Sequence, residues 1–144
     1  MSSGRSGWKN KFFLYESASS YHNKIRDILI NHFLFENLSC YQEVPVKDLA
    51  PDYVNYYDCI DWFIDEYSLA IEIHGEQHYK PVAFTTGISY QDKIKTFNNI
   101  RYRDNRKKQT LLDGGYNYIA ISYKEIKSLT PEKLYQIIIK EIHE

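Results

Sequence analysis

Two short apolar segments, residues 58–64 and 68–74, each carry an acid where a buried strand normally carries an apolar side chain. Asp61 lies in the run CIDWFI, and Glu72 lies in the run LAIEIH. A buried carboxyl group is costly unless it is paired, hydrogen-bonded or bound to a metal ion. A short turn at residues 65–66 separates the segments, so they predict a β-hairpin whose two carboxyl groups lie near each other at one end of a sheet.

Two converging carboxylates favour Mg²⁺ or Mn²⁺, because these ions take oxygen ligands and leave positions open for water and a substrate phosphate. Such an ion can activate water and stabilise the charge that develops on a phosphodiester. The sequence therefore predicts Asp61 and Glu72 as metal ligands. The plainer alternative is that Asp61 caps a strand end and Glu72 pairs with a surface lysine.

Two histidines follow the second acid closely. His74 lies two residues after Glu72, so strand alternation points both side chains to the same face. His78 lies beyond Gly75, in the mouth of the following loop. Either imidazole can transfer a proton near neutral pH. A histidine with a purely structural role is the alternative for each.

A third acid lies in the long charged helix that the sequence predicts over residues 90–112. A rotation of about 100° per residue places six residues on one face: Ile94, Phe97, Arg101, Asp104, Lys108 and Leu111. Asp104 then faces inward, and Lys108, one turn later, can hold Asp104 or a phosphate. An ordinary ion pair between Asp104 and Lys108 is the alternative.

The same helix carries a basic cluster, formed by Arg101, Arg103, Arg106, Lys107 and Lys108. Such a cluster can contact phosphates, although a solvated helix face is the commoner explanation. Weaker candidates for the site are His22, Glu16 and Glu43, for which a surface or capping role is the alternative.

Length and composition set limits on the class of protein. The 144 residues suffice for one domain, predicted over 19–144 after a flexible segment over 1–18. The net charge of −1 indicates no particular partner, and the two cysteines argue against a disulfide scaffold or a Cys-rich zinc site. We therefore expect a cytoplasmic protein. No apolar run has the length of a signal peptide or a membrane span, so no membrane association is expected.

The predicted fold class is α/β, with a mixed central sheet flanked by helices in the order α-β-β-β-α-β-α. The predicted elements are a helix over 19–37, strands over 40–47, 58–64, 68–74 and 116–123, loops over 48–57 and 75–90, a helix over 90–112 and a last helix from Pro131. Pro45 favours an edge position for the first strand. Gly114 and Gly115 stop the long helix, and Thr130 caps the last one.

The order of these motifs resembles a known nuclease family. Asp61-x-Phe63, LAIEIHGEQH, RD and LLDGGYNYIAIS follow one another between about residues 20 and 124. This pattern is similar to the very-short-patch-repair-like branch of the PD-(D/E)XK nucleases, which includes phage homing endonucleases with a site described as EDxHD. The resemblance implies a restriction-endonuclease-like fold and Mg²⁺- or Mn²⁺-dependent hydrolysis of DNA. It also implies a phage or another mobile element as the source, with the protein acting inside the host cell.

The resemblance implies a role for each matching residue. Asp61 matches the metal-binding Asp, while Glu72 and His74 occupy the (D/E)-x-K positions. His78 and Asp104 match the H and the final D of EDxHD.

The first residue of EDxHD, a Glu on the first helix, falls at His22 in this chain. The resemblance further implies that Arg106, Lys107 or Lys108 steadies the scissile phosphate. Three loop aromatics can stack on bases or wedge between them, and packing within the loop is the alternative: Tyr79, Phe84 and Tyr90.

Three other functions stay open. One is a nuclease-fold protein that binds nucleic acid without cutting it, which the missing helix-one Glu favours. Another is a subunit or interaction module of a larger assembly. The third, an enzyme that cuts RNA, fits less well than a DNA endonuclease. A homodimer is compatible with each of them.

Overall fold

The centre of the protein is a mixed five-stranded sheet in the spatial order β1-β2-β3-β4-β5. The computed structural model describes residues 8–10, 20–81 and 89–143. The strands are β1 (Lys9–Asn10), β2 (Cys40–Pro45), β3 (Cys59–Ile64), β4 (Leu69–His74) and β5 (Asn117–Ser122). Strands β1 to β4 are antiparallel to their neighbours, and β5 is parallel to β4. The predicted α/β class with a mixed sheet and the predicted hairpin of residues 58–74 are confirmed.

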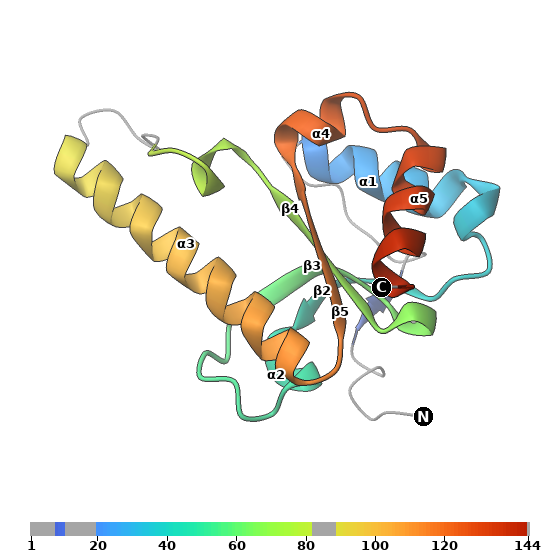
Figure 1. Ribbon diagram of the computed structural model, residues 1–144, viewed down its shortest axis with the longest axis horizontal. Helices are drawn as coiled ribbons and strands as arrows, with labels where there is room; N and C mark the ends of the chain where they lie inside the picture. Colours follow the sequence, from blue (N-terminus) through green and yellow to red (C-terminus); the bar gives the residue numbers. More distant parts are fainter. Residues whose placement is uncertain (1–7, 11–19, 82–88, 144) are drawn as a thin grey trace.

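Helices cover both faces of this sheet (Figure 1). The helices are α1 (Ser20–Asn31), α2 (Val46–Leu49), α3 (Tyr90–Asp113), α4 (Tyr123–Lys127) and α5 (Pro131–Ile142), and the 3-10 turns are η2 (Phe33–Phe35), η3 (Asp65–Tyr67) and η4 (Glu76–His78). Figure 1 shows α1, α4 and α5 on one side of the sheet and the long α3 on the other. The link from β4 to β5 runs through α3, as a parallel pair of strands requires.

Two apolar cores lie on the two faces of the sheet. The larger one packs Leu29 and Ile138 against Trp62 and Ile71. The smaller one, on the α3 side, includes Val44, Ile60, Phe63 and Leu111. Several buried polar residues lie near the smaller core: Glu72, His74 and Lys107. The apolar packing therefore holds α3 against the strands that carry the candidate site.

Strands β3 and β4 separate where the candidate site lies. Their pairing ends at Trp62 and Ile71. Trp62 packs into the larger core, whereas Ile60, only two residues earlier, packs into the smaller one. Opposite this point, Glu43 of β2 has a left-handed φ of 52°. The regular inward and outward alternation of β3 therefore breaks around Asp61. A polar side chain can there take the place of a backbone acceptor in the hydrogen-bond ladder between β3 and β4.

Some element ends differ from the sequence prediction. The helix predicted to reach residue 37 ends at Asn31, because His32 is extended and its Nδ1 accepts the N–H of Leu34 at 3.2 Å, which starts η2. The strand predicted to reach residue 47 ends at Pro45, where α2 begins. Pro45 does not lie on an edge strand, since β1 pairs with β2, but it lies beyond the two residues that β1 contacts.

Strand β1 and helices α2 and α4 have no counterpart in the predicted order. Helix α4 begins with a capping box in which Ser122 and Glu125 exchange side-chain and backbone hydrogen bonds, a pattern that is visible in the sequence. Strand β1 lies within the segment predicted to be flexible, and the neighbouring Trp8 packs edge-on against Tyr41 and Phe63. The rest of residues 1–18 lies outside the described residues.

Candidate metal and catalytic site

Asp61 lies where β3 and β4 part, and its two oxygens have different surroundings. Oδ2 accepts the backbone N–H of Ile73 at 2.7 Å, which satisfies a donor that has left the regular ladder. Oδ1 lies 3.8 Å from Nδ1 of His22 on α1. Because the side chain is 23% exposed, the carboxylate is held in place and still reaches solvent.

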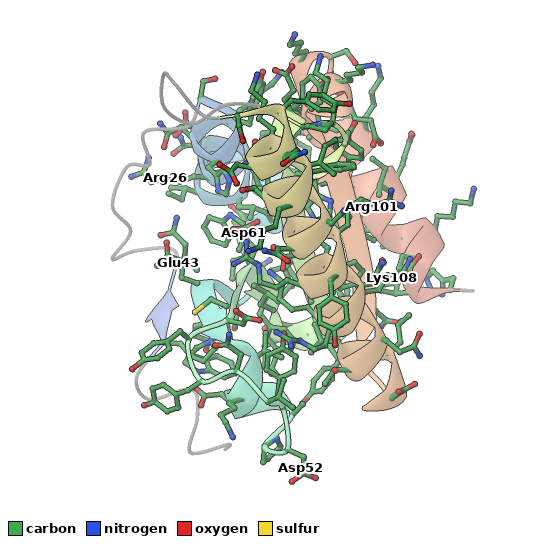
Figure 2. The ribbon with its side chains drawn as sticks, turned by 90° about the vertical axis from the view of Figure 1, so that its left-hand side faces the viewer. Arg26, Glu43, Asp52, Asp61, Arg101 and Lys108 are labelled. Carbon is green, nitrogen blue, oxygen red and sulfur yellow. The ribbon has the colours of Figure 1, made fainter. Side chains whose placement is uncertain are left out.

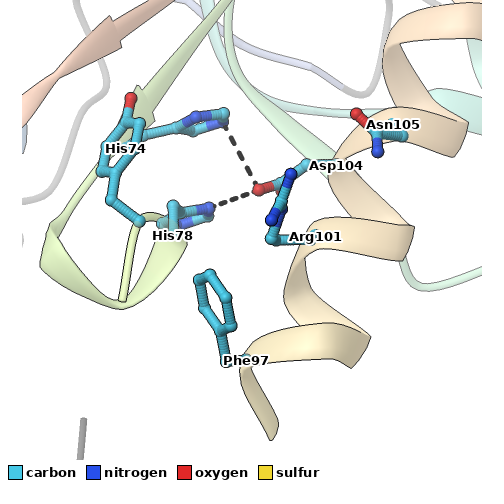
Figure 3. Close-up of a pocket in the computed structure, with 7 residues that line it drawn as sticks. His74, His78, Phe97, Arg101, Asp104 and Asn105 are labelled. Carbon is cyan, nitrogen blue, oxygen red and sulfur yellow. Dashed lines mark hydrogen bonds and ion pairs between the residues drawn. The ribbon is translucent and has the colours of Figure 1, made fainter. Parts of the chain in front are cut away.

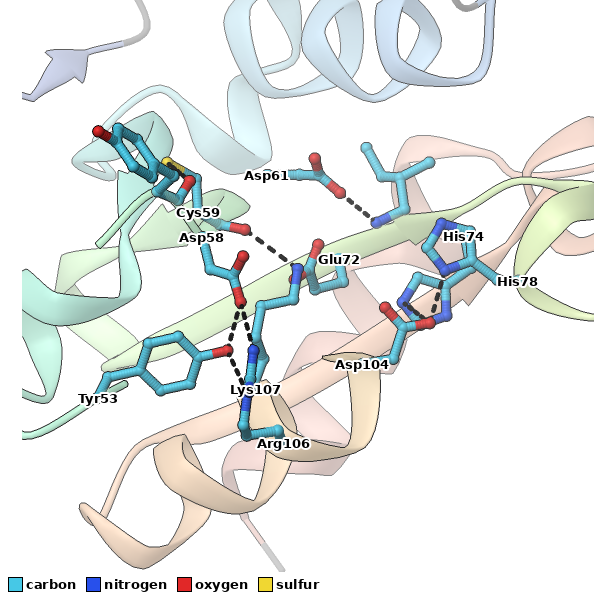
Figure 4. Close-up of polar contacts among 12 residues, drawn as sticks. Tyr53, Asp58, Cys59, Asp61, Glu72, His74, His78, Asp104, Arg106 and Lys107 are labelled. Atoms are coloured by element: carbon cyan, nitrogen blue, oxygen red, sulfur yellow. Dashed lines mark hydrogen bonds and ion pairs between the residues drawn. The ribbon is translucent and has the colours of Figure 1, made fainter. Parts of the chain in front are cut away.

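Glu72 lies on β4 and meets a buried lysine from α3 (Figure 4). Lys107 Nζ is 2.5 Å from Glu72 Oε1 and donates to the carbonyl of Cys59 at 3.1 Å. Both side chains of the ion pair are less than 10% exposed. The alternative for Glu72 was an ion pair with a surface lysine. A lysine does pair with Glu72, but this lysine is buried.

Asp61 and Glu72 lie close enough for each carboxyl group to affect the ionisation of the other. Burial and the neighbouring charge of Asp61 raise the pKa of Glu72 to about 8, although Lys107 opposes the shift. Burial also raises the pKa of Asp61. Near neutral pH the pair therefore retains a proton, and a divalent cation would have to displace it.

His74, His78 and Asp104 form a second group, from the ends of β4 and η4 and from α3 (Figure 3). His78 Nδ1 lies 2.6 Å from Asp104 Oδ2, and His74 Nε2 lies 3.9 Å from the same oxygen. The two imidazole rings stack in parallel, with their centroids 4.2 Å apart. The sequence proposed each of these residues for the site separately, and the structure brings the three together.

The protonation of this group follows from its contacts. Burial alone would raise the pKa of Asp104, but the hydrogen bond with His78 lowers it overall. An ionised Asp104 at 2.6 Å requires a proton on His78 Nδ1, which leaves the lone pair on Nε2. Burial and the nearby His78 lower the pKa of His74 to about 4, so its ring is neutral near pH 7.

A pocket of about 350 Å³ opens beside these residues. Its lining consists of His74, His78, Tyr79, Phe97, Arg101, Asp104 and Asn105. The pocket combines an imidazole that can accept a proton with an arginine that can meet an anion. Its size suits a small part of a large substrate, such as one phosphate and its sugar.

The donor set of Asp61 and Glu72 fits a hard divalent cation. Both side chains offer carboxylate oxygens, the ligand type that Mg²⁺ and Mn²⁺ prefer. The ammonium group of Lys107, 2.5 Å from Glu72 Oε1, occupies one side of this carboxylate. Asp61 and the other oxygen of Glu72 are the donor atoms that would hold such an ion.

The basic residues of α3 divide into two groups. Arg101, Arg103 and Lys108 are exposed, and Figure 2 shows Arg101 and Lys108 along the same edge of the helix. Lys107 is buried on Glu72 and Arg106 is engaged elsewhere, so neither extends freely toward a ligand. The prediction that Lys108 faces inward beside Asp104 is wrong: the buried positions of α3 are Ile100, Lys107 and Leu111, and Asp104 pairs with His78.

The remaining candidates lie around the rim. His22 faces Asp61. Burial lowers the pKa of His22, although the charges of Glu72 and Glu43 act to raise it. Glu43 is exposed, and Figure 2 shows it close to Asp61 in that view. Tyr79 is half-exposed beside His74, and Tyr90 is exposed at the start of α3. Glu16 and Phe84 lie outside the described residues.

One buried polar group was not predicted. Asp58 is only 7% exposed and accepts a hydrogen bond from the Tyr53 hydroxyl at 2.5 Å. Arg106 Nη2 lies 3.4 Å from the same carboxylate, and its guanidinium stacks on Tyr53 and Tyr102. This network ties α3 to the chain that leads into β3. A single acid before a strand gives no signal of it: Tyr53 is near in sequence, but Arg106 comes from α3, 48 residues away.

No protein-family model matches the chain, and no curated protein or solved structure matches it. The likeness to the PD-(D/E)XK nucleases therefore stays a prediction. Within the described residues, no helix combines the length and the apolar character that a membrane span needs.

Proposed function

We propose that the chain is a metal-dependent endonuclease that hydrolyses phosphodiester bonds in DNA, with a restriction-endonuclease-like domain over 19–144 acting in the cytoplasm. The observation that carries this proposal is the meeting of two carboxyl groups at the point where β3 and β4 part, beside a histidine held by an aspartate. Metal-bound carboxylates and an adjacent proton acceptor are the parts that hydrolysis of a phosphodiester needs.

Asp61 and Glu72 would hold Mg²⁺ or Mn²⁺. When bound, the ion lowers the pKa of water and stabilises charge on the phosphate. His78 takes the proton from the attacking water at Nε2, because Asp104 fixes the proton on Nδ1. Lys107 compensates the charge of Glu72 once that carboxyl group has lost its proton.

The exposed basic side chains of α3 would contact the DNA backbone. Arg101 lines the pocket beside His78, so it can meet the phosphate nearest the site. Arg103 and Lys108 are exposed elsewhere on the helix and can contact neighbouring phosphates. Binding through these side chains weakens steeply as salt concentration rises.

A second candidate function is DNA binding without cleavage. Two observations favour it: His22 stands where the EDxHD pattern has Glu, and Lys107 occupies a cation position beside Glu72. The two functions differ in their metal requirement, because cleavage needs the divalent ion and simple binding does not.

The deciding experiment is cleavage of supercoiled plasmid DNA with Mg²⁺, Mn²⁺ or EDTA. Asp61→Asn is the informative variant, since Asn keeps an oxygen for the Ile73 N–H but loses the charge. Asp52→Asn, which changes an exposed acid, is the matched control. We expect metal-dependent nicking by the wild type and the control, and a loss of about 100-fold or more in Asp61→Asn.

Equal activity of wild type and Asp61→Asn would refute the assigned metal site. Tight binding of the wild type to DNA in EDTA, with no nicking in either metal, would favour the second candidate. Competition by unlabelled RNA measures whether RNA is the better substrate.

A further inference from the structure

The group formed by His74, His78 and Asp104 has a composition that the proposed magnesium site does not need. One donor atom from each residue lies within 4.8 Å of the others. We propose that these three residues bind a transition-metal ion of the Zn²⁺ class, at a site separate from the Asp61–Glu72 pair.

The donor chemistry separates the two sites. Two imidazole nitrogens and one carboxylate are ligands that zinc takes in proteins, with a water as the fourth ligand. Asp61 and Glu72 offer oxygen atoms, which suit Mg²⁺ and Mn²⁺ instead. One chain can therefore hold a hard ion at the strand break and a softer ion at the histidines.

Unpaired polar atoms in this group support the assignment. His74 Nε2 and Asp104 Oδ1 are buried and have no hydrogen-bond partner among the described residues. The His74 side chain is only 10% exposed, and the Asp104 side chain 12%. A buried polar atom without a partner is costly. A metal ion between the three residues would satisfy His74 Nε2, and it would satisfy Asp104 Oδ1 once the carboxylate turned, because the oxygen that now faces the histidines is Oδ2.

Binding needs a local rearrangement. Zinc–nitrogen bonds are about 2.1 Å long, so a tetrahedral ion needs donor atoms about 3.4 Å apart. The rings of His74 and His78 are now stacked, and His78 Nδ1 is hydrogen-bonded to Asp104. The His78 ring has to turn out of the stack, and the adjacent pocket of about 350 Å³ gives it room to do so.

A bound ion would inhibit DNA cleavage, and this consequence rests on the proposed function, whereas binding itself does not. A neutral imidazole has one lone pair. If the lone pair of His78 Nδ1 goes to the metal ion, the remaining proton sits on Nε2, which can then no longer accept a proton from water. Zn²⁺ would thus switch off a site that Mg²⁺ activates.

The test is a titration of the metal-free full chain with Co²⁺, followed by visible absorption, and then displacement of Co²⁺ by Zn²⁺ without DNA. The informative variants are His74→Ala and His78→Ala, with His143→Ala as the control because His143 is exposed near the chain end. Asp61→Asn and Cys59→Ser locate the ion relative to the other candidate ligands.

We expect one ion per chain that excess Mg²⁺ cannot displace, whereas any Co²⁺ at the Asp61–Glu72 pair should be displaced by excess Mg²⁺. Affinity should fall by at least ~10-fold in each informative variant and stay unchanged in the other three. Absence of Co²⁺ and Zn²⁺ binding by the wild type overturns the proposal, whatever the variants do. So does a loss of binding in Asp61→Asn or Cys59→Ser that equals the loss in the histidine variants.

The two proposals fail in different ways. Zinc binding by a chain that never cuts DNA would refute the nuclease and leave this site standing. Mg²⁺-dependent cleavage by a chain that binds neither Co²⁺ nor Zn²⁺ would refute this site and leave the nuclease standing.

Discussion

Glu72→Gln tests the buried carboxyl pair most directly. Gln has the size of Glu and resembles its protonated form, but it cannot ionise. Burial and the charge of Asp61 raise the pKa of Glu72 from 4.5 to about 8. A tenfold change in a dissociation constant is worth about 1.4 kcal/mol, so ionising Glu72 costs about 5 kcal/mol more in the folded protein than in the unfolded chain.

The sign of the effect follows from where the proton is bound. Between the ordinary pKa of Glu72 and its raised value, the unfolded chain has released the proton and the folded protein retains it. The free energy of unfolding of the wild type therefore falls as pH rises through this window. Glu72→Gln has no proton to lose at this position, so its free energy of unfolding does not fall for this reason. The variant should equal the wild type within about 1 kcal/mol near pH 5 and exceed it by up to about 5 kcal/mol near pH 9.

The measurement is urea unfolding across this pH range, in EDTA so that no divalent ion occupies the pair. Fluorescence reports unfolding because Trp62 is 1% exposed in the folded protein. Asp52→Asn removes an exposed carboxyl group and should follow the wild type at every pH. If the wild type and Glu72→Gln lost stability in parallel, Glu72 would not retain its proton, and the reasoning on the buried pair would be wrong.

Three further substitutions have defined outcomes. Asp104→Asn should lower the cleavage rate by about 100-fold or more and leave the affinity for DNA in EDTA unchanged, because it removes the negative charge that fixes the proton on His78 Nδ1, and the amide NH2 can donate to that nitrogen instead. Asp58→Asn should lower the free energy of unfolding by about 1.5–3 kcal/mol in urea, since the Tyr53 hydroxyl loses a charged, buried acceptor. Phe35→Ala should lower it by about 3–5 kcal/mol, because this fully buried ring leaves a cavity.

The sequence was informative about the strands because their geometry is simple. A short turn between two apolar segments allows few pairing registers between the two strands. An acid in each strand then lies close to the other acid, and burial requires that the acids be hydrogen-bonded to each other or bound to a metal ion. Asp61 and Glu72 were found in this way. The family resemblance implied that His78 and Asp104 belong to one site, but their hydrogen bond was not predicted, since 26 residues separate them and no local pattern links them.

The sequence was less informative about α3 because a helical stripe can be drawn in more than one phase. The predicted stripe included Lys108, whereas the structure buries Lys107 together with Ile100 and Leu111. Apolar content cannot decide between two neighbouring lysines. The choice depends on Glu72, which lies on another element and attracts the lysine that points toward it.

The charges at the site also imply an order of binding. Asp104 is ionised, His74 is neutral, and the Asp61–Glu72 pair has one buried cation, Lys107, close to it. Without a metal ion, the carboxyl groups of the site repel an entering phosphate once they are ionised. Arg101, which lines the pocket, is the exposed positive charge that can attract that phosphate. A divalent cation changes this balance, because it displaces the shared proton and adds one net positive charge where the substrate phosphate binds. In the proposed nuclease, the metal ion would therefore bind before the scissile phosphate, and DNA bound in its absence would lie along the exposed face of α3 rather than at the carboxyl pair.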